Sequence, residues 1–221
     1  MDQAFDTYQT IQGESTAQFT EQRSRFISFA WHVTDTDQVK EHVAALQKEY
    51  YDARHVCYAY MLGPGRLEWR AVDNGEPSGT AGRPILGQIN SAGLTDILIC
   101  VVRYFGGVKL GTSGLIEAYR EAAREAIDAA RIVTKYVESR IEVLFTYAMM
   151  NELMRIVKDM EPRILEQEYG AFTCDLSGRV FDCRMLLSIR LSQSDMLMER
   201  ITDSVRTQPN PEMVCRTAMA V

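Results

Sequence analysis

Two glycine-rich segments contain the residues best suited to chemistry, and each of them precedes an expected helix. The first is DNGEPSGTAG at 73–82, and the second is FGGVKLGTSG at 105–114. Glycine lets the backbone approach a bound group closely, and the free N–H groups of a helix start attract anions. Arg83, Arg103 and Lys109 add positive charge in or beside these segments. The pattern predicts a cradle for phosphate groups of a nucleotide or an RNA backbone. The alternative is that the glycines only turn the chain.

Established phosphate-binding motifs do not fit these segments. The lysine of GGVKLGTSG precedes the Gly-Thr pair, whereas a P-loop requires Gly-Lys-Ser/Thr after four intervening residues. No GxGxxG opens a helix after an expected strand, so a dinucleotide-binding fold is not expected either. Ser78 and Thr80 either contact a ligand or cap the next helix.

Acid–base, nucleophilic and metal chemistry have weaker support. Asp73 and Glu76 flank a turn and suit an acid–base pair or a Mg²⁺ site, but turn and helix-end roles explain them equally. His55 and Cys57 share one face of an expected strand, about 6–7 Å apart, which is too far for direct contact. The three histidines lack the spacing of zinc ligands. The sequence therefore assigns no catalytic residue and predicts no metal and no cofactor.

Basic and aromatic side chains also lie together on two expected strands. They are Arg54, His55, Tyr58 and Tyr60 on one, and Arg103, Tyr104 and Phe105 with the nearby Lys109 on the other. This combination suits single-stranded RNA, because cations pair with phosphates and aromatic rings stack on bases. The alternative is that Tyr58, Tyr60 and Phe105 belong to the core.

Charge and composition narrow the class of protein. The 221 residues have a net charge of −6, which argues against nonspecific coating of DNA, whereas residues 53–120 contain seven Lys/Arg and five Asp/Glu. The five cysteines are single and odd in number, which favours reduced thiols over a disulfide framework. No secretory signal and no apolar stretch of about 20 residues is visible, so we expect a cytoplasmic protein without a membrane span.

Hydrophobic periodicity predicts alternating strands and helices throughout the chain. The expected strands of the first part are 15–19, 25–33, 55–62, 67–72 and 94–104, and its helices are 35–50, 84–91 and 115–130. The second part has expected strands at 139–147, 164–175, 180–191 and 213–220 and helices at 151–160 and 194–206. Its strand–helix–strand–strand–helix–strand order is typical of a ferredoxin-like fold.

Three strings are distinctive enough to indicate a family. They are ARHVCYAY at 53–60, DNGEPSGTAGRPIL at 73–86 and VVRYFGGVKLGTSGLIEAYREAAREAI at 101–127. With SRFI at 24–27, they resemble the YigZ/IMPACT family over most of the first part. Asn74 departs from the aspartate frequent in relatives and weakens a paired carboxylate with Asp73. The matching motif positions are His55, Asp73, Glu76, Pro77, Ser78, Gly79, Thr80, Gly82, Arg103, Tyr104, Gly106, Gly107, Lys109, Leu110 and Gly111.

The resemblance implies an α+β fold of two α/β sandwich domains. Residues 1–134 are expected to be similar to the second domain of a small-subunit ribosomal protein, to domain IV of elongation factor G and to the GHMP kinases. Residues 135–221 are expected to be ferredoxin-like, as domain V of elongation factor G is. Eukaryotic relatives regulate translation by competing for the activator of a stress kinase, a partner that the resemblance does not transfer to this chain.

We therefore expect a non-enzymatic protein that binds RNA or the ribosome and modulates translation. One alternative is an enzyme acting on a phosphorylated small molecule or nucleotide, with Asp73 or Glu76 as base. Another is a protein-interaction module, with a protein partner docked on the C-terminal domain. The residues expected to contact ligand or phosphate are His55, Asp73, Glu76, Ser78, Thr80, Arg83, Arg103, Tyr104, Gly106, Gly107 and Lys109.

Overall fold

The computed structural model describes residues 6–174, 178–205 and 213–218. Contacts divide the chain into a first unit, Thr7–Lys135, and a second unit, Met1–Asp6 with Tyr136–Val221. This division falls one residue beyond the expected boundary. Asp6 groups with the second unit, whereas the sequence expectation includes it in the first; its carboxylate accepts hydrogen bonds from the backbone N–H and the hydroxyl of Ser192.

The first unit is built on an antiparallel sheet of order β2-β3-β6-β4-β5. These strands are β2 (Glu14–Glu21), β3 (Ser24–His32), β4 (His55–Leu62), β5 (Glu68–Val72) and β6 (Ile97–Tyr104). The helices are α1 (Thr36–Glu49), α2 (Gly82–Ser91) and α3 (Gly111–Asp128). A separate two-stranded sheet pairs β1 (Thr7–Ile11) with β7 (Ile132–Tyr136).

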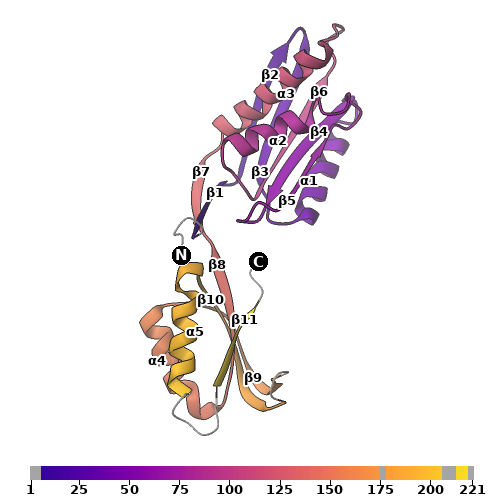
Figure 1. Cartoon of the computed structure of the whole chain (residues 1–221). Coiled ribbons are helices and arrows are strands. Elements are labelled where there is room, and N and C mark those ends of the chain that lie inside the picture. Colours follow the sequence, from indigo (N-terminus) through magenta and orange to yellow (C-terminus); the bar gives the residue numbers. More distant parts are fainter. Residues whose placement is uncertain (1–5, 175–177, 206–212, 219–221) are drawn as a thin grey trace. The chain divides into compact units, whose positions relative to one another are not determined.

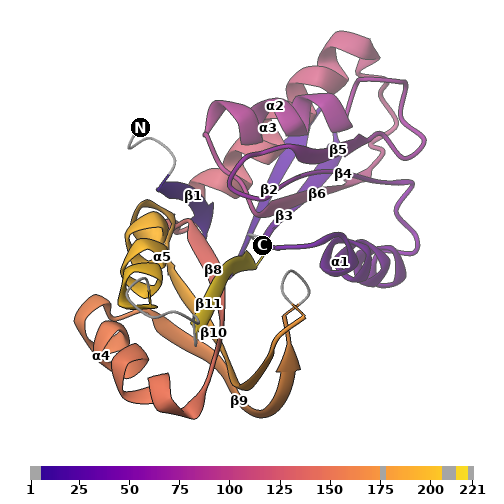
Figure 2. The same cartoon turned by 60° about the horizontal axis from the view of Figure 1, so that its bottom comes forward.

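The central strand β6 explains why its sequence is continuously apolar. Successive side chains of a strand point to opposite faces of the sheet. Ile97, Ile99 and Val101 therefore join the core under α2 and α3, whereas Leu98 and Cys100 join the core under α1. Figures 1 and 2 show α2 and α3 on one face of the sheet and α1 on the other. Because both faces are covered, β6 is buried on both sides.

The second unit has the expected strand–helix–strand–strand–helix–strand order. Its elements are β8 (Glu138–Phe145), the short 3₁₀ helix η2 (Tyr147–Met149), α4 (Met150–Met160), β9 (Arg163–Thr173), β10 (Val180–Arg190), α5 (Leu191–Val205) and β11 (Met213–Ala218). The antiparallel sheet has the order β11-β8-β10-β9. Of the expected ranges, residues 175, 206, 219 and 220 lie outside the described residues. The whole chain is thus a mixed α+β protein of two units.

Several boundaries differ from the expectation. Helix α3 begins at Gly111 rather than at 115, and α2 begins at Gly82 rather than at 84. Strands β1 and β7 were not expected at all. Within the described residues, no helix combines the length and the apolar character that crossing a membrane requires.

Candidate functional site

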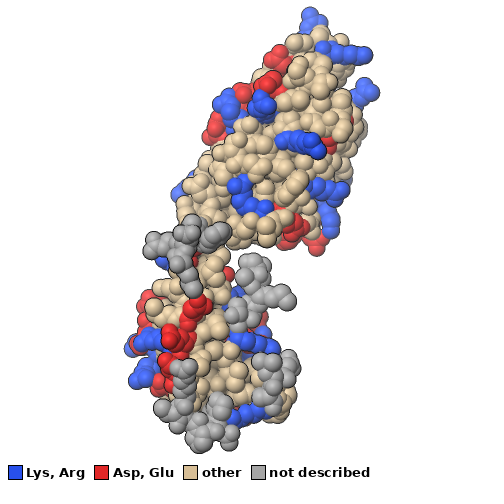
Figure 3. Space-filling view, viewed as in Figure 1, with Lys and Arg blue, Asp and Glu red and all other residues tan. Residues whose placement is uncertain are grey.

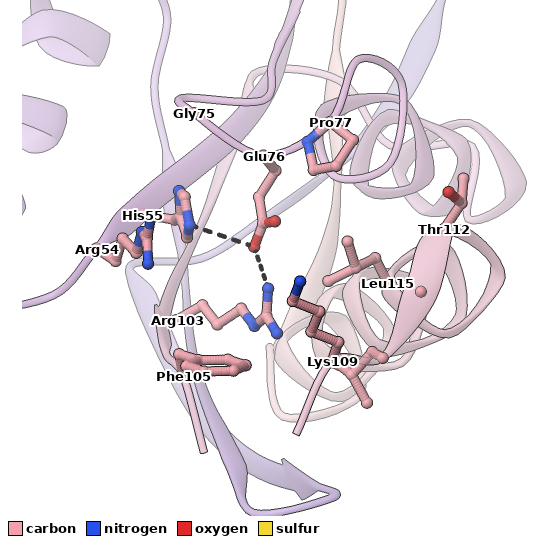
Figure 4. A pocket seen from close by; sticks show the side chains of 12 residues that line it. Arg54, His55, Gly75, Glu76, Pro77, Arg103, Phe105, Lys109, Thr112 and Leu115 are labelled. Atoms are coloured by element: carbon pink, nitrogen blue, oxygen red, sulfur yellow. Dashed lines mark hydrogen bonds and ion pairs between the residues drawn. The ribbon is translucent and has the colours of Figure 1, made fainter. Parts of the chain in front are cut away.

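A cavity of about 430 Å³ opens in the first unit where four segments meet. We call it the pocket. It is lined by Arg54 and His55 at the start of β4, Gly75, Glu76 and Pro77 before α2, Arg103 and Phe105 at the end of β6, and Lys109, Leu110, Gly111, Thr112 and Leu115 around the start of α3. Figure 4 shows these side chains around one opening. The two glycine-rich segments therefore meet at this site.

The carboxylate of Glu76 is the centre of the pocket's polar contacts. Its side chain is 3% exposed, and its Oε1 accepts hydrogen bonds from Arg103 Nη1 at 2.6 Å and from the Tyr119 hydroxyl at 2.9 Å. Arg103 is 6% exposed and its Nη2 reaches the hydroxyl of Ser24. The pair is therefore a buried, hydrogen-bonded ion pair at the base of the pocket.

His55 is held with a defined orientation. Its Nδ1 lies 3.0 Å from the carbonyl oxygen of Asn74, so a proton on Nδ1 is donated to that carbonyl. Its Nε2 then faces the pocket, 3.9 Å from Glu76 Oε1. Gly75 has a φ of +86°, and a Cβ there would lie 3.2 Å from Nδ1 of His55. Glycine at this position thus allows both the turn and the close approach of the ring.

Cys57 lies beneath the pocket and is not arranged as a nucleophile. Its thiol donates to the carbonyl oxygen of Asp73 at 2.8 Å and lies 3.3 Å from the Tyr119 hydroxyl. Burial raises the pKa of the Cys57 thiol to about 12. Because the thiolate is the reactive form, this cysteine is chemically inert near neutral pH.

Uncompensated positive charge remains at the rim of the pocket. Arg54 and Lys109 are exposed, and neither forms an ion pair with any residue that the structure describes. The start of α3 has no side-chain cap, so the N–H groups of its first turn add partial positive charge. Three cations and one carboxylate leave a formal charge of +2 when His55 is neutral.

The start of α2, by contrast, is already occupied by a carboxylate. Asp73 accepts hydrogen bonds from the backbone N–H of Gly79 at 2.7 Å, Ala81 at 3.0 Å and Gly82 at 2.8 Å. Partial burial alone raises the pKa of Asp73, but these donors outweigh it and the pKa is lowered. The half of the predicted cradle at 73–82 is therefore filled from within. An anion site remains only on the α3 side.

The other predicted contact residues lie outside the pocket. Ser78 is exposed in the turn, and the buried Thr80 donates its hydroxyl to the carbonyl of Pro77 at 2.7 Å. Neither side chain caps α2. Arg83 lines a different depression, which Arg120 lines as well.

Three further predicted residues, close to Arg103 and Phe105 in the sequence, also lie outside the pocket lining. Tyr104 donates its hydroxyl to Asp52, and its ring lies under Arg25 on the α1 side of the sheet. A Cβ at Gly106 would lie 2.0 Å from the backbone carbon of Arg23, so only glycine fits. Gly107 has a φ of +86°. The structure therefore brings together His55, Glu76, Arg103 and Lys109, which is four of the eleven predicted residues.

The sequence missed Tyr119 and Thr112. Tyr119 lies in the apolar stripe of α3, four residues after Leu115; it is fully buried, but its hydroxyl contacts Glu76. Thr112 belongs to the glycine-rich segment 105–114, which the sequence predicts as a loop, whereas the structure places it in the first turn of α3. The available signal for Tyr119 was its hydroxyl, a polar group among the otherwise apolar residues of the stripe. Among the described residues, no cluster of three His, Cys, Asp or Glu suits a metal ion.

Comparison with known proteins identifies the family. The family model for the Impact N-terminal domain matches residues 22–127. The IMPACT family member YigZ of Escherichia coli (strain K12) is 32% identical over 152 residues, which are 68% of this chain and 74% of that protein. The IMPACT family member YvyE of Bacillus subtilis (strain 168) is 29% identical over 164 residues, 74% of this chain and 76% of that protein.

A solved structure shares the whole fold. The crystal structure of a hypothetical protein matches 98% of this chain and 99% of that one, with a TM-score of 0.73 and 23% identity. At this identity the likeness concerns the fold alone. On the sequence matches, the chain belongs to the IMPACT family.

Proposed function

We propose that the protein binds RNA through the pocket of its first unit and acts in translation, as an RNA- or ribosome-binding protein. The observation that supports this best is the convergence of Arg54, Arg103 and Lys109 with the uncapped start of α3 on one cavity. RNA offers phosphates for these groups and bases for the exposed ring of Phe105. The function is one of binding, in the cytoplasm, without a catalysed reaction.

The distribution of charge fits a local contact better than a broad one. Figure 3 shows both signs of charge interspersed on the visible face of the first unit. A protein that coats nucleic acid presents a continuous basic surface instead. We therefore assign the RNA contact to a few phosphates at the pocket.

The likeness to elongation factor G belongs to the same proposal. A first unit like domain IV and a second unit like domain V would give the chain the domain series found at the end of that factor. The antiparallel α/β layers of the first unit and the split βαβ order of the second support this reading. Fold analogy alone is a weak argument for function, so the RNA experiment decides it.

Fluorescence anisotropy with a single-stranded RNA over a salt series tests the proposal. Binding to a few phosphates predicts a linear fall of log K with log salt, with a slope of about −0.7 per phosphate. We expect Lys109→Glu to weaken binding by at least about tenfold, because an attraction becomes a repulsion beside the phosphate. Lys48→Glu makes the same change on an exposed lysine of α1 and should leave affinity within about twofold. Affinity that ignores salt, or that Lys109→Glu leaves intact, contradicts the proposal.

A second candidate is an enzyme acting on a phosphorylated small molecule or nucleotide. It is favoured by the position of His55 Nε2, which faces Glu76 at 3.9 Å inside a closed-ended cavity. Of the two proposed bases, Glu76 lines the pocket whereas Asp73 is engaged at α2. Thermal-shift screening with nucleotides and sugar phosphates separates the candidates: strong stabilisation by one metabolite and none by RNA would favour the enzyme.

A further inference from the structure

The pocket is closed at its base, which limits how a strand of RNA can enter it. Glu76 and Arg103 form this base, with side chains 3% and 6% exposed, and the fully buried Tyr119 lies beneath them. Figure 4 shows the other lining groups arranged around them. Since the contacts of 2.6 Å and 2.9 Å leave no passage between these side chains, a strand cannot run through the cavity.

The size of the pocket fits one nucleotide. Its volume of about 430 Å³ lies within the range of roughly 300–1,000 Å³ typical of sites for single small molecules. Surfaces that follow a single strand instead accommodate about 4–16 nucleotides along an open groove. A strand bound here therefore places one nucleotide in the cavity, and the closed base favours a nucleotide at its end.

The charge of the pocket fits a terminal phosphate better than an internal one. The formal charge is +2, from Arg54, Arg103 and Lys109 against Glu76. A phosphodiester within a strand has a charge of −1, whereas a phosphate monoester has about −1.5 to −2 at pH 7 and three free oxygens. The monoester therefore neutralises the pocket more completely.

The pocket also contains a donor without a partner. The side chain of Arg103 is more than nine-tenths buried, and its Nε has no hydrogen-bond partner among the described residues. Figure 4 shows that this side chain points into the cavity. A buried N–H without an acceptor leaves the positive charge of Arg103 incompletely compensated by its neighbours, which favours an anion in the cavity. The start of α3 also lines the pocket, and its uncapped first turn offers further donors.

An aromatic ring stands where a base would lie. Phe105 lines the pocket and is 47% exposed, and the guanidinium of Arg103 lies 5.8 Å from its ring centroid. An exposed ring beside a cation stacks on any base, without selecting its sequence.

From these observations we infer that the pocket takes the phosphorylated end of an RNA strand. The terminal phosphate contacts Lys109, Arg103 and the start of α3, and the terminal base stacks on Phe105. This inference rests on the proposed function and adds to it which part of the RNA is recognised.

The test compares four forms of one short RNA by anisotropy and competition with the full-length chain. They have a 5′-phosphate, a 3′-phosphate, hydroxyl groups at both ends, or a closed circle. We expect one phosphorylated form to bind at least about tenfold more tightly than the hydroxyl-ended and circular forms. The two phosphorylated forms identify which end is bound. A nucleoside monophosphate should compete, whereas the nucleoside should not.

Matched variants link this preference to the pocket. Lys109→Gln should reduce the preference to less than about twofold, and Lys48→Gln should retain it, with thermal melting to verify that both fold. Equal binding of all four forms would overturn the inference and leave the proposed function standing. No binding of any RNA would overturn both. If the nucleoside monophosphate binds and none of the four RNA forms does, the inference is rejected and the small-molecule enzyme is favoured.

Discussion

Glu76 and Arg103 stabilise each other in a place where either group alone would be costly. Both side chains are almost fully buried, and Nη1 of Arg103 lies 2.6 Å from Oε1 of Glu76. Removing one partner of a buried pair leaves an uncompensated charge, which typically costs about 3–5 kcal/mol. Among the described residues, the Tyr119 hydroxyl would then be the one remaining hydrogen-bond donor to Glu76.

Arg103→Met should therefore lower the free energy of unfolding by about 3–5 kcal/mol. Adding Glu76→Gln to this variant should recover about 1–3 kcal/mol, because the buried charge is removed while the oxygen that accepts from Tyr119 remains. Urea unfolding of both single variants and the double variant measures this coupling. Losses that simply add would show that the two side chains do not depend on each other.

Asp73 makes a second electrostatic contribution to the stability of the fold. The sign of its pH dependence follows from the direction of the pKa shift. Its pKa is lowered in the folded protein, so its contribution is fully present above its unfolded pKa near 3.9 and disappears as the pH falls through the folded pKa. Asp73→Asn should cost about 1–2 kcal/mol at pH 7, since the charge at the start of α2 is lost.

The difference between wild type and Asp73→Asn should shrink as the pH falls below about 4, because the unfolded wild-type chain then takes up a proton at Asp73 before the folded protein does. Urea midpoints at pH 7 and pH 3 measure this change. Asp37→Asn, in an exposed pair with Lys40, is the control and should cost less than about 1 kcal/mol. A deficit of equal size at both pH values would rule out a charge effect at Asp73.

At the scale of the element, α2 contains two glycines with opposite requirements. A Cβ at Gly82 would lie 2.4 Å from the backbone nitrogen of Val72, so the helix start approaches β5 too closely for any other residue. A Cβ at Gly87 meets nothing within 4 Å. Helix propensity alone would favour alanine at both positions.

Gly87→Ala should therefore stabilise the protein by about 0.5–1 kcal/mol, whereas Gly82→Ala should destabilise it. Thermal melting of the two variants gives the comparison within a single helix. Stabilisation by Gly82→Ala would mean that α2 does not pack against β5 as closely as described.

The same contrast shows how far local patterns predict this fold. The helix that the sequence places at 35–50 and the element order of the second unit follow from short-range patterns, and the structure confirms them. The pairing of β1 with β7 joins residues more than 120 positions apart, and no local pattern reveals it. For the same reason, the sequence does not reveal which of the two glycine-rich segments keeps its N–H groups free. The answer depends on where the Asp73 side chain turns.

For the whole molecule, the charge is unevenly divided. Residues 7–135 contain 14 Lys/Arg and 15 Asp/Glu, whereas the remaining residues contain 10 and 15. Most of the net charge of −6 therefore belongs to the second unit. An acidic unit repels RNA at long range, which is a further reason to assign the RNA contact to the pocket of the first unit.

The hydrophobic cores are divided in the same way. Each buried cluster of the described residues lies within a single unit: two within the first and two within the second. Ile99 and Leu187 are fully buried members of different cores. Units with separate cores can unfold in separate steps, and a two-state treatment then fails.

We therefore expect Leu187→Ala, at a cost of about 2–5 kcal/mol, to shift one calorimetric transition of the full chain and leave the other in place. Ile99→Ala makes a comparable cavity in the first unit and should shift the other transition. Only Ile99→Ala should lower the temperature at which RNA binding is lost, because the pocket belongs to the first unit. If both variants moved a single shared transition, the two units would unfold as one cooperative body. The second unit would then contribute to the stability of the pocket.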